Sequence, residues 1–176
     1  MHYGRIATTD IANGTGVRVS LYVSGCTNHC PGCFQPETWD FSYGSPYDQS
    51  TEDLIVRELE KSYYEGLTIL GGEPFEPSNQ LCLAPLVLRV AAMVPERTIW
   101  MYTGFTYDQD LMPGQRRYTE VTDSILDHID VLVDGRFLIE KKNISLAFRG
   151  SENQRIIDMP QTREKRQIIL HPLQFR

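Results

Sequence analysis

The segment VSGCTNHCPGCFQPETWDF, residues 23–41, contains three of the four cysteines of the chain: Cys26, Cys30 and Cys33. Their spacing is C-x3-C-x2-C, and the glycines and the proline among them suit the bends of a short loop. Such a loop can direct three thiolates at one compact group. The spacing therefore predicts a metal or redox site directly after the strand that ends near residue 23.

The residues alone leave three interpretations of this loop open. Structural zinc normally takes four protein ligands, and His29 or Cys82 would have to be the fourth in a spacing that is unusual for zinc fingers. A disulfide between Cys26 and Cys30, or between Cys30 and Cys33, is the second interpretation. The third is a [4Fe–4S] cluster, which usually takes four thiolates, so three cysteines would leave one iron open to a ligand.

Outward from this loop, apolar patterns predict an alternation of strands and helices. The predicted strands are residues 17–23, 67–72, 98–104 and 130–135, and the predicted helices are residues 49–66, 78–94 and 119–129. Strands separated by helix-length segments favour parallel pairing with right-handed crossovers. We therefore expect an α/β fold with a mainly parallel sheet, in a single domain that spans residues 1–176.

The segments that follow the predicted strands are rich in glycine and polar residues. Besides the cysteine loop, they are GGEP at 71–74, YTG at 102–104 and VDG at 133–135. Ligands of parallel sheets bind beyond the carboxyl ends of the strands, so these segments predict one common site. Glu73 suits an ammonium group, and Tyr102 and Thr103 are candidates for further ligand contacts.

The composition narrows the class of protein. The chain has 176 residues, of which 41% are hydrophobic and 23% charged, as in ordinary globular proteins. The net charge of −6 gives no electrostatic reason to bind nucleic acid or anionic lipid. No apolar run approaches the ~20 residues of a membrane span, and the N-terminus lacks the apolar core of a signal peptide. We expect a cytoplasmic protein with reduced thiols and with neither nucleic-acid nor membrane partners.

The cysteine loop at the end of a first strand, together with GGEP, resembles the radical S-adenosylmethionine (SAM) enzymes. The resemblance implies a partial (β/α) barrel and a [4Fe–4S] cluster on Cys26, Cys30 and Cys33, with SAM at the open iron. The residue before the third cysteine is often aromatic in that superfamily and is Gly32 here, so Phe34 is the candidate to cover the adenine or the cluster. The implied cofactor-binding residues are Gly32, Cys33, Phe34, Gly71, Gly72, Glu73 and Asp134, the last beside a monovalent cation.

From about residue 10 to residue 158 the chain more narrowly resembles the activating proteins of anaerobic ribonucleoside-triphosphate reductase, a branch of the glycyl-radical-enzyme activases. The matching stretches are DIANGTGVRVSLYVSGC, CPGCFQPETWDF, LTILGGEPFEP, IWMYTGFTYDQ, IDVLVDGRF and LAFRGSENQRIID. This resemblance implies glycyl-radical formation in the large reductase subunit, with electrons from an external donor such as flavodoxin or ferredoxin. An activase of another enzyme, such as pyruvate formate-lyase, and a radical SAM enzyme with a small-molecule substrate are the alternatives.

Two segments are most particular to this branch, NGTG at 13–16 and RGSENQR at 149–155. We hypothesise that they receive the glycine loop of the partner or order the rim of the site, and ordinary turns are the alternative. Residues 159–176 form a basic C-terminal tail, which we expect to be solvated or loosely docked.

Overall fold

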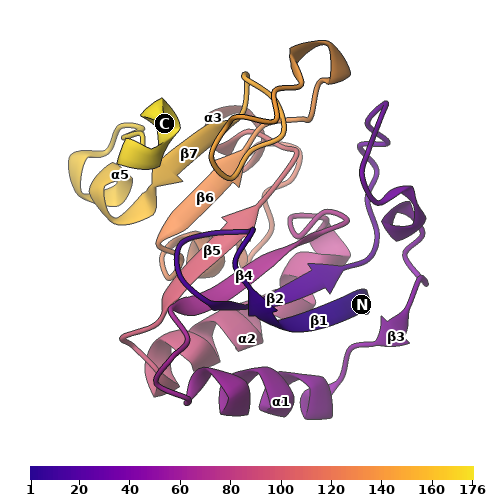
Figure 1. Cartoon of the computed structure of the whole chain (residues 1–176), viewed down its shortest axis with the longest axis vertical. Helices are drawn as coiled ribbons and strands as arrows, with labels where there is room; N and C mark the ends of the chain where they lie inside the picture. Colours follow the sequence, from indigo (N-terminus) through magenta and orange to yellow (C-terminus); the bar gives the residue numbers. More distant parts are fainter.

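Four parallel strands form the centre of one sheet in the computed structural model, which describes residues 1–176 (Figure 1). They are β2 (Arg18–Val23), β4 (Gly66–Gly71), β5 (Thr98–Tyr102) and β6 (Val131–Asp134). Each neighbouring pair is parallel, in the order β2-β4-β5-β6. The four predicted strands and their parallel pairing are therefore confirmed.

Antiparallel strands that the sequence patterns did not predict extend this centre on both sides. They are β1 (His2–Asp10), β3 (Ser45–Pro46) and β7 (Arg155–Asp158). The result is a mixed sheet of seven strands in the order β3-β1-β2-β4-β5-β6-β7. The fold is a single α/β domain whose sheet is parallel only in its centre, and the sheet begins before residue 10.

Two of the three predicted helices are shorter than expected, those at 49–66 and 119–129, whereas the helix predicted at 78–94 has the expected length. The helices are α1 (Gln49–Leu59), α2 (Pro77–Met93), α3 (Tyr107–Asp110), α4 (Thr122–Leu126) and α5 (Met159–Lys165), with 3-10 turns at η1 (Pro36–Trp39), η2 (Ile139–Lys141) and η3 (Pro172–Phe175). Asp48 caps α1 by accepting a hydrogen bond from the Thr51 N–H at 3.0 Å. The helix ends at Leu59, because residues 60–65 form turns that lead into β4. By contrast, α2 continues through Pro85. None of the helices is long and apolar enough to cross a membrane.

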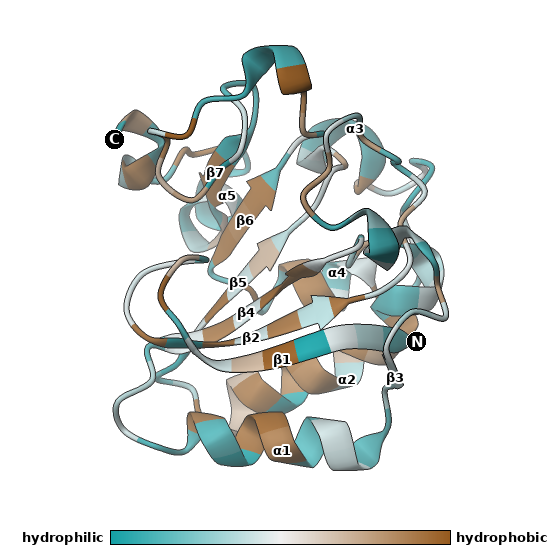
Figure 2. Ribbon diagram, turned by 45° about the vertical axis from the view of Figure 1, so that its right-hand side comes forward, coloured by the Kyte–Doolittle hydropathy of each residue, from teal (hydrophilic) through white to brown (hydrophobic).

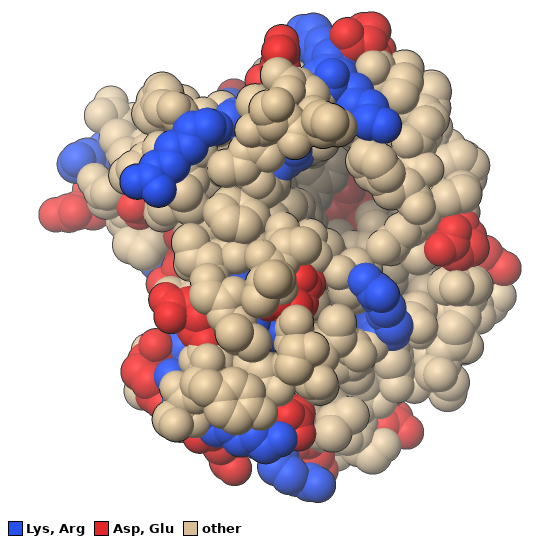
Figure 3. Space-filling view, viewed as in Figure 1, with Lys and Arg blue, Asp and Glu red and all other residues tan.

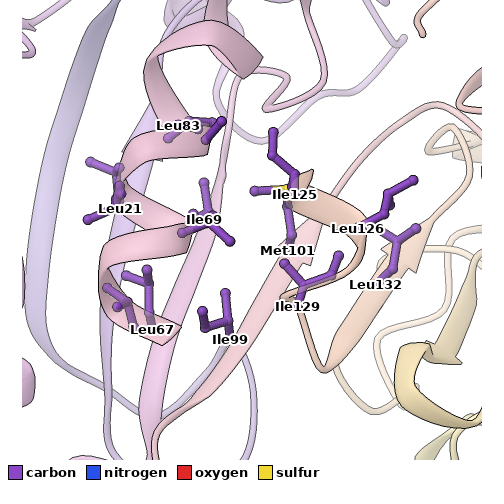
Figure 4. Close-up of a cluster of buried hydrophobic side chains, with 14 of the residues drawn as sticks. Leu21, Leu67, Ile69, Leu83, Ile99, Met101, Ile125, Leu126, Ile129 and Leu132 are labelled. Atoms are coloured by element: carbon purple, nitrogen blue, oxygen red, sulfur yellow. The ribbon is translucent and has the colours of Figure 1, made fainter. Parts of the chain in front are cut away.

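One face of the sheet packs against α1, α2 and α4 and forms the hydrophobic core (Figures 2 and 4). Every second residue of each strand points into this core, because side chains alternate between the faces of a strand. The residues labelled in Figure 4 belong to it: Leu21, Leu67, Ile69, Leu83, Ile99, Met101, Ile125, Leu126, Ile129 and Leu132. This packing fixes the strands, and through them the segments that follow each strand.

The opposite face of the sheet is partly polar and is crossed by residues 11–17, which form the loop in front of the strands in Figure 1. Arg18 is fully buried there. Its guanidinium donates hydrogen bonds to Thr68 Oγ1 at 2.6 Å, the Thr98 carbonyl at 2.9 Å and the Thr15 carbonyl at 3.3 Å. Burial lowers the pKa of Arg18 to about 10. This residue ties the NGTG segment to the sheet.

The C-terminal tail is docked, so the expectation of a solvated or loosely docked terminus is wrong. Asp158 caps α5 by accepting from the Gln161 N–H at 2.9 Å, and Met159 is fully buried. Leu170 then forms an antiparallel bridge with Ile157 of β7. The tail thereby pairs with the edge strand β7 and covers it.

Candidate functional site

A cavity of about 580 Å³ opens at the carboxyl ends of the central strands. Tyr22, Leu70 and Tyr102 line it from β2, β4 and β5, on the sheet face opposite α1, α2 and α4. Figure 3 shows the molecule hollowed on this side, with acidic atoms at the bottom of the hollow. Glu73 is the only acidic residue in the lining.

The cysteine loop forms one wall of this cavity, and Cys26, Cys30 and Cys33 all line it as free thiols. The base of the loop is closed by a backbone hydrogen bond from the Gly25 N–H to the Thr38 carbonyl at 2.8 Å. Cys26 is buried, and burial raises the pKa of its thiol to about 11. Metal binding at Cys26 therefore has to displace a proton.

The donor set that lines the cavity, three thiols, is of the kind that binds an iron–sulfur cluster. No three His, Cys, Asp or Glu side chains lie close enough together to bind one metal ion. In a [4Fe–4S] cluster each thiolate binds a different iron, so the sulfurs stand farther apart than the ligands of one ion. His29, the fourth ligand in the zinc interpretation, instead places its ring 4.7 Å from that of Trp39.

Gly71 and Gly72 both line the cavity, and close backbone approach explains why they are glycines. Gly71 has φ of +108°, and a Cβ there would lie 2.7 Å from the backbone N and O of Val23. A Cβ on Gly72 would lie 2.7 Å from the Gly25 carbonyl oxygen. The end of β4 can therefore meet the cysteine loop directly, and the Glu73 N–H donates to the Gly25 carbonyl at 2.9 Å. The expected approach of a ligand to these glycines stays a prediction.

Glu73 is fully buried beside the cysteine loop and accepts four hydrogen bonds. Its Oε1 accepts from Thr103 Oγ1 at 2.7 Å and the Phe75 N–H at 2.9 Å. Its Oε2 accepts from the Gly104 N–H at 2.7 Å and Asn28 Nδ2 at 3.0 Å. Burial outweighs these bonds and raises the pKa of Glu73 to about 7. The site holds a carboxylate whose charge a cationic group would stabilise.

Glu76, which no sequence motif singled out, also holds the cysteine loop through hydrogen bonds. Its Oε1 accepts from the Thr27 N–H at 2.9 Å and from Thr27 Oγ1 at 2.5 Å. Its Oε2 accepts from Arg117 Nη1 at 2.9 Å, and Arg117 Nη2 also donates to Thr27 Oγ1 at 2.8 Å. Glu73 and Glu76 thus hold two consecutive loop residues, Asn28 and Thr27.

Replacement of Glu76 by glutamine should loosen this anchor. The side chain of Glu76 is 3% exposed, and an amide NH₂ cannot accept from either Arg117 or Thr27. We expect the free energy of unfolding of the apoprotein to fall by about 1–3 kcal/mol, measured by chemical denaturation. The matched control is Glu96→Gln, which removes an exposed ion pair to Arg97 and should cost well under about 1 kcal/mol. Equal stability of both variants would contradict the anchor.

Two other predicted residues lie at the third cysteine. Phe34 lines the cavity and is 67% exposed, with its ring 5.4 Å from that of Phe137. Gly32 does not line the cavity. A Cβ on Gly32, at its φ of +73°, would lie 2.8 Å from Ile139 Cδ1, so this glycine admits a neighbouring segment of the protein.

Asp134 is buried outside the lining of the cavity. Its Oδ1 accepts from Arg155 Nε at 2.8 Å, and its Oδ2 accepts from Arg155 Nη2 and from the Tyr107 N–H. A carboxylate neutralised in this way is a poor ligand for a monovalent cation, because the guanidinium already supplies the positive charge. The structure gives no support to the predicted cation contact of Asp134.

Tyr102 and Thr103, at the carboxyl end of β5, have different surroundings. Thr103 lines the cavity, but its hydroxyl donates to Glu73. The hydroxyl of Tyr102 is buried without a hydrogen-bond partner, and the residue lines the cavity.

The wall that faces the cysteine loop could not be predicted in full from the motifs. This wall comes from residues 135–154 and includes Phe137, Lys142, Phe148, Arg149 and Gln154. Asn13 of the NGTG motif also lines the cavity. The motifs NGTG and RGSENQR were the sequence features that pointed to this wall, and both contribute residues to the cavity. Asn153 and Arg155, by contrast, lie outside its lining.

The chain is similar to known proteins over most of its length. The family model described as a 4Fe-4S single cluster domain matches residues 12–157. The anaerobic ribonucleoside-triphosphate reductase-activating protein of Pasteurella multocida is 39% identical over 156 residues, which cover 88% of this chain and 95% of that protein. Proteins of the same name from Escherichia coli K12 and Enterobacteria phage T4 are 38% and 36% identical, with coverage of 88% and 89% of this chain and 96% and 93% of theirs. The chain belongs to the family of anaerobic ribonucleoside-triphosphate reductase-activating proteins and contains the 4Fe-4S single cluster domain.

Proposed function

We propose that this protein is a radical SAM activase that generates a glycyl radical on the large subunit of anaerobic ribonucleoside-triphosphate reductase. The observation that carries the proposal is the meeting of three free cysteines and one buried carboxylate in a single cavity. The names of its relatives identify the target enzyme. We also infer that the half-covered sheet is the partial (β/α) barrel of radical SAM enzymes, because its open face holds the cavity.

The proposed division of labour follows from the geometry. Cys26, Cys30 and Cys33 would hold the [4Fe–4S] cluster, and Glu73 would hold the amino group of SAM, since it is the only acidic residue in the lining. When bound, the reduced cluster would supply the electron that splits SAM into methionine and a 5′-deoxyadenosyl radical, the species able to take a hydrogen atom from the α-carbon of a glycine. The chain itself positions these groups and excludes water and oxygen. We leave the predicted monovalent cation out, because Arg155 already neutralises Asp134.

The remaining partners follow from the same reasoning. The chain shows no fingerprint of a nicotinamide or flavin site, so electrons would come from an external donor such as flavodoxin or ferredoxin. The chemistry needs a reducing compartment, and we propose the cytoplasm. Neither nucleic acid nor a membrane has a part in the proposed reaction.

Mixing experiments test this function directly. The anaerobically reconstituted protein, SAM and a strong reductant should produce a glycyl radical in the large subunit of the reductase, detected by electron paramagnetic resonance (EPR). Formation of 5′-deoxyadenosine should depend on the reductase. A radical formed only on pyruvate formate-lyase would favour the other activase, and 5′-deoxyadenosine yields unaffected by either protein would favour a small-molecule enzyme.

A further inference from the structure

Residues 153–155 are bound in register to residues 134–136. Arg155 pairs with the carboxylate of Asp134, as described above. Gln154 Nε2 donates to the Gly135 carbonyl at 2.9 Å, and Asn153 Nδ2 donates to the Arg136 carbonyl at 2.9 Å. Three consecutive side chains of the RGSENQR motif thus hold three consecutive residues at the end of β6. We call residues 153–155 the clasp.

Gln154 is the central residue of this clasp. Its Oε1 accepts from the Gly150 N–H at 2.8 Å and the Ser151 N–H at 3.1 Å, while its Nε2 bonds Gly135. One side chain therefore joins the turn at 150–151 to the end of β6. Because Gln154 also lines the cavity, loss of these hydrogen bonds would loosen the wall of the site.

The segment that the clasp holds continues directly over the cysteine loop. Residues 136–142, which we call the cover, touch that loop at its middle and at its end. Arg136 Nη2 donates to the Asn28 carbonyl at 2.7 Å. Ile139 lies against Gly32, since a Cβ on Gly32 would come within 2.8 Å of Ile139 Cδ1.

The cover also packs on Phe34, the residue after the third cysteine. The ring of Phe137 lies 5.4 Å from that of Phe34, and Lys142 Nζ lies 5.1 Å from the centre of the Phe34 ring. Such aromatic and cation–π contacts are each worth on the order of the thermal energy or more. Contacts on Gly32 and Phe34 flank Cys33 on both sides, so the cover restrains this cysteine in particular.

We propose that the clasp holds the cover on the cysteine loop, and that Gln154 is thereby a positioning residue for Cys33. No contact of Gln154 with the cysteine loop is needed, because Gly135 and Arg136 connect the two. The restraint on Cys33 is a property of the protein without cofactors. Its consequence, protection of a bound cluster from oxygen, rests on the proposed function.

Alkylation of the apoprotein tests the restraint without cluster or SAM. Thiol reactivity depends on access, so iodoacetamide should label Cys33 about 3- to 10-fold faster in Gln154→Ala than in the wild-type protein, read by mass spectrometry. Cys82 on α2 is an internal control whose rate should not change. Gln154→Glu keeps the acceptor for Gly150 and Ser151 but loses the donor to Gly135, so it should behave as Gln154→Ala does. Gln109→Ala, an exposed site on α3, should match the wild type.

The results that would refute the role of Gln154 differ from those that would refute the proposed activase function. An unchanged rate at Cys33 would show that the clasp does not restrain it. Equal acceleration at Cys82 would show general loosening of the fold, which also removes the special role of Gln154. After reconstitution, the two Gln154 variants should lose cluster absorbance in air several-fold faster than Gln109→Ala. Normal bleaching together with faster alkylation would refute the protective consequence alone.

Discussion

Replacement of Cys33 by alanine is expected to lower reductive SAM cleavage by more than about 100-fold. Only three cysteines line the cavity, so loss of one leaves two thiolates for a cluster that needs at least three. Iron content after anaerobic reconstitution should fall in parallel, measured against the wild-type value of about four irons per chain. Both quantities are measured on the same preparation.

Cys82→Ala is the matched control for this experiment. Cys82 lies on α2, outside the cavity, with its sulfur 3.7 Å from the N-terminal nitrogen of Met1. It should therefore keep full iron content and full SAM cleavage. Cleavage that survives in Cys33→Ala, or that is lost in Cys82→Ala, would show that the ligands have been assigned wrongly.

Replacement of Glu73 by glutamine should weaken SAM binding by about 10- to 100-fold, because a charge-assisted hydrogen bond to the amino group becomes a neutral one. The amide would also present N–H groups to donors such as the Gly104 N–H, which now points at Glu73 Oε2. Equilibrium binding of SAM to the reconstituted protein measures the effect. Glu120→Gln, at an exposed position, is the control, and equal affinities of the two variants would remove Glu73 from the SAM site.

The raised pKa of Glu73 gives this site a defined pH dependence. The pKa rises from 4.5 to about 7 on folding, so the folded apoprotein binds this proton more tightly than the unfolded chain does. The resulting stabilisation is fully present below about pH 4.5 and is lost as the pH rises through about 7. Between pH 5.5 and pH 8 the free energy of unfolding should fall by about 2 kcal/mol more in the wild type than in Glu73→Gln. Parallel pH profiles of the two proteins would contradict the assigned pKa.

Ligand binding should show the opposite trend with pH. The N–H groups of the SAM amino group bond best to the ionised form of Glu73, whose population grows about tenfold between pH 6 and pH 8 when the pKa is about 7. The affinity for SAM should rise by up to about tenfold over that range. This dependence should be absent in Glu73→Gln.

The central strands could be predicted from the sequence because their pattern is local. Val19, Leu21 and Val23 alternate with residues of the other face, and glycines mark the end of β4. Strand β1 gave no such pattern, because it lies near the edge of the sheet and most of its residues are half-buried. Strand β7 has only four residues and is defined by its pairing with β6, which a local pattern does not contain.

For the site too, features of short segments could be predicted and tertiary contacts could not. The cysteines and Glu73 could be placed because their spacing and their position after strands are properties of short segments. The partner of Asp134 could not, since Arg155 lies 21 residues farther along the chain. Glu76 and Gln154 act through Thr27 and Gly135, and such contacts depend on the tertiary fold. Motif reasoning located the cavity, and only the structure showed what holds its walls.

Electron–nuclear double resonance on the reduced holoprotein tests the central claim most directly. With SAM labelled by ¹⁵N in its amino group, we predict a coupling between the label and one iron of the cluster, because three cysteine ligands leave that iron open. The coupling should disappear when unlabelled SAM replaces the labelled compound. A cluster whose four irons are all bound by protein side chains, with no coupling to the label, would contradict the account.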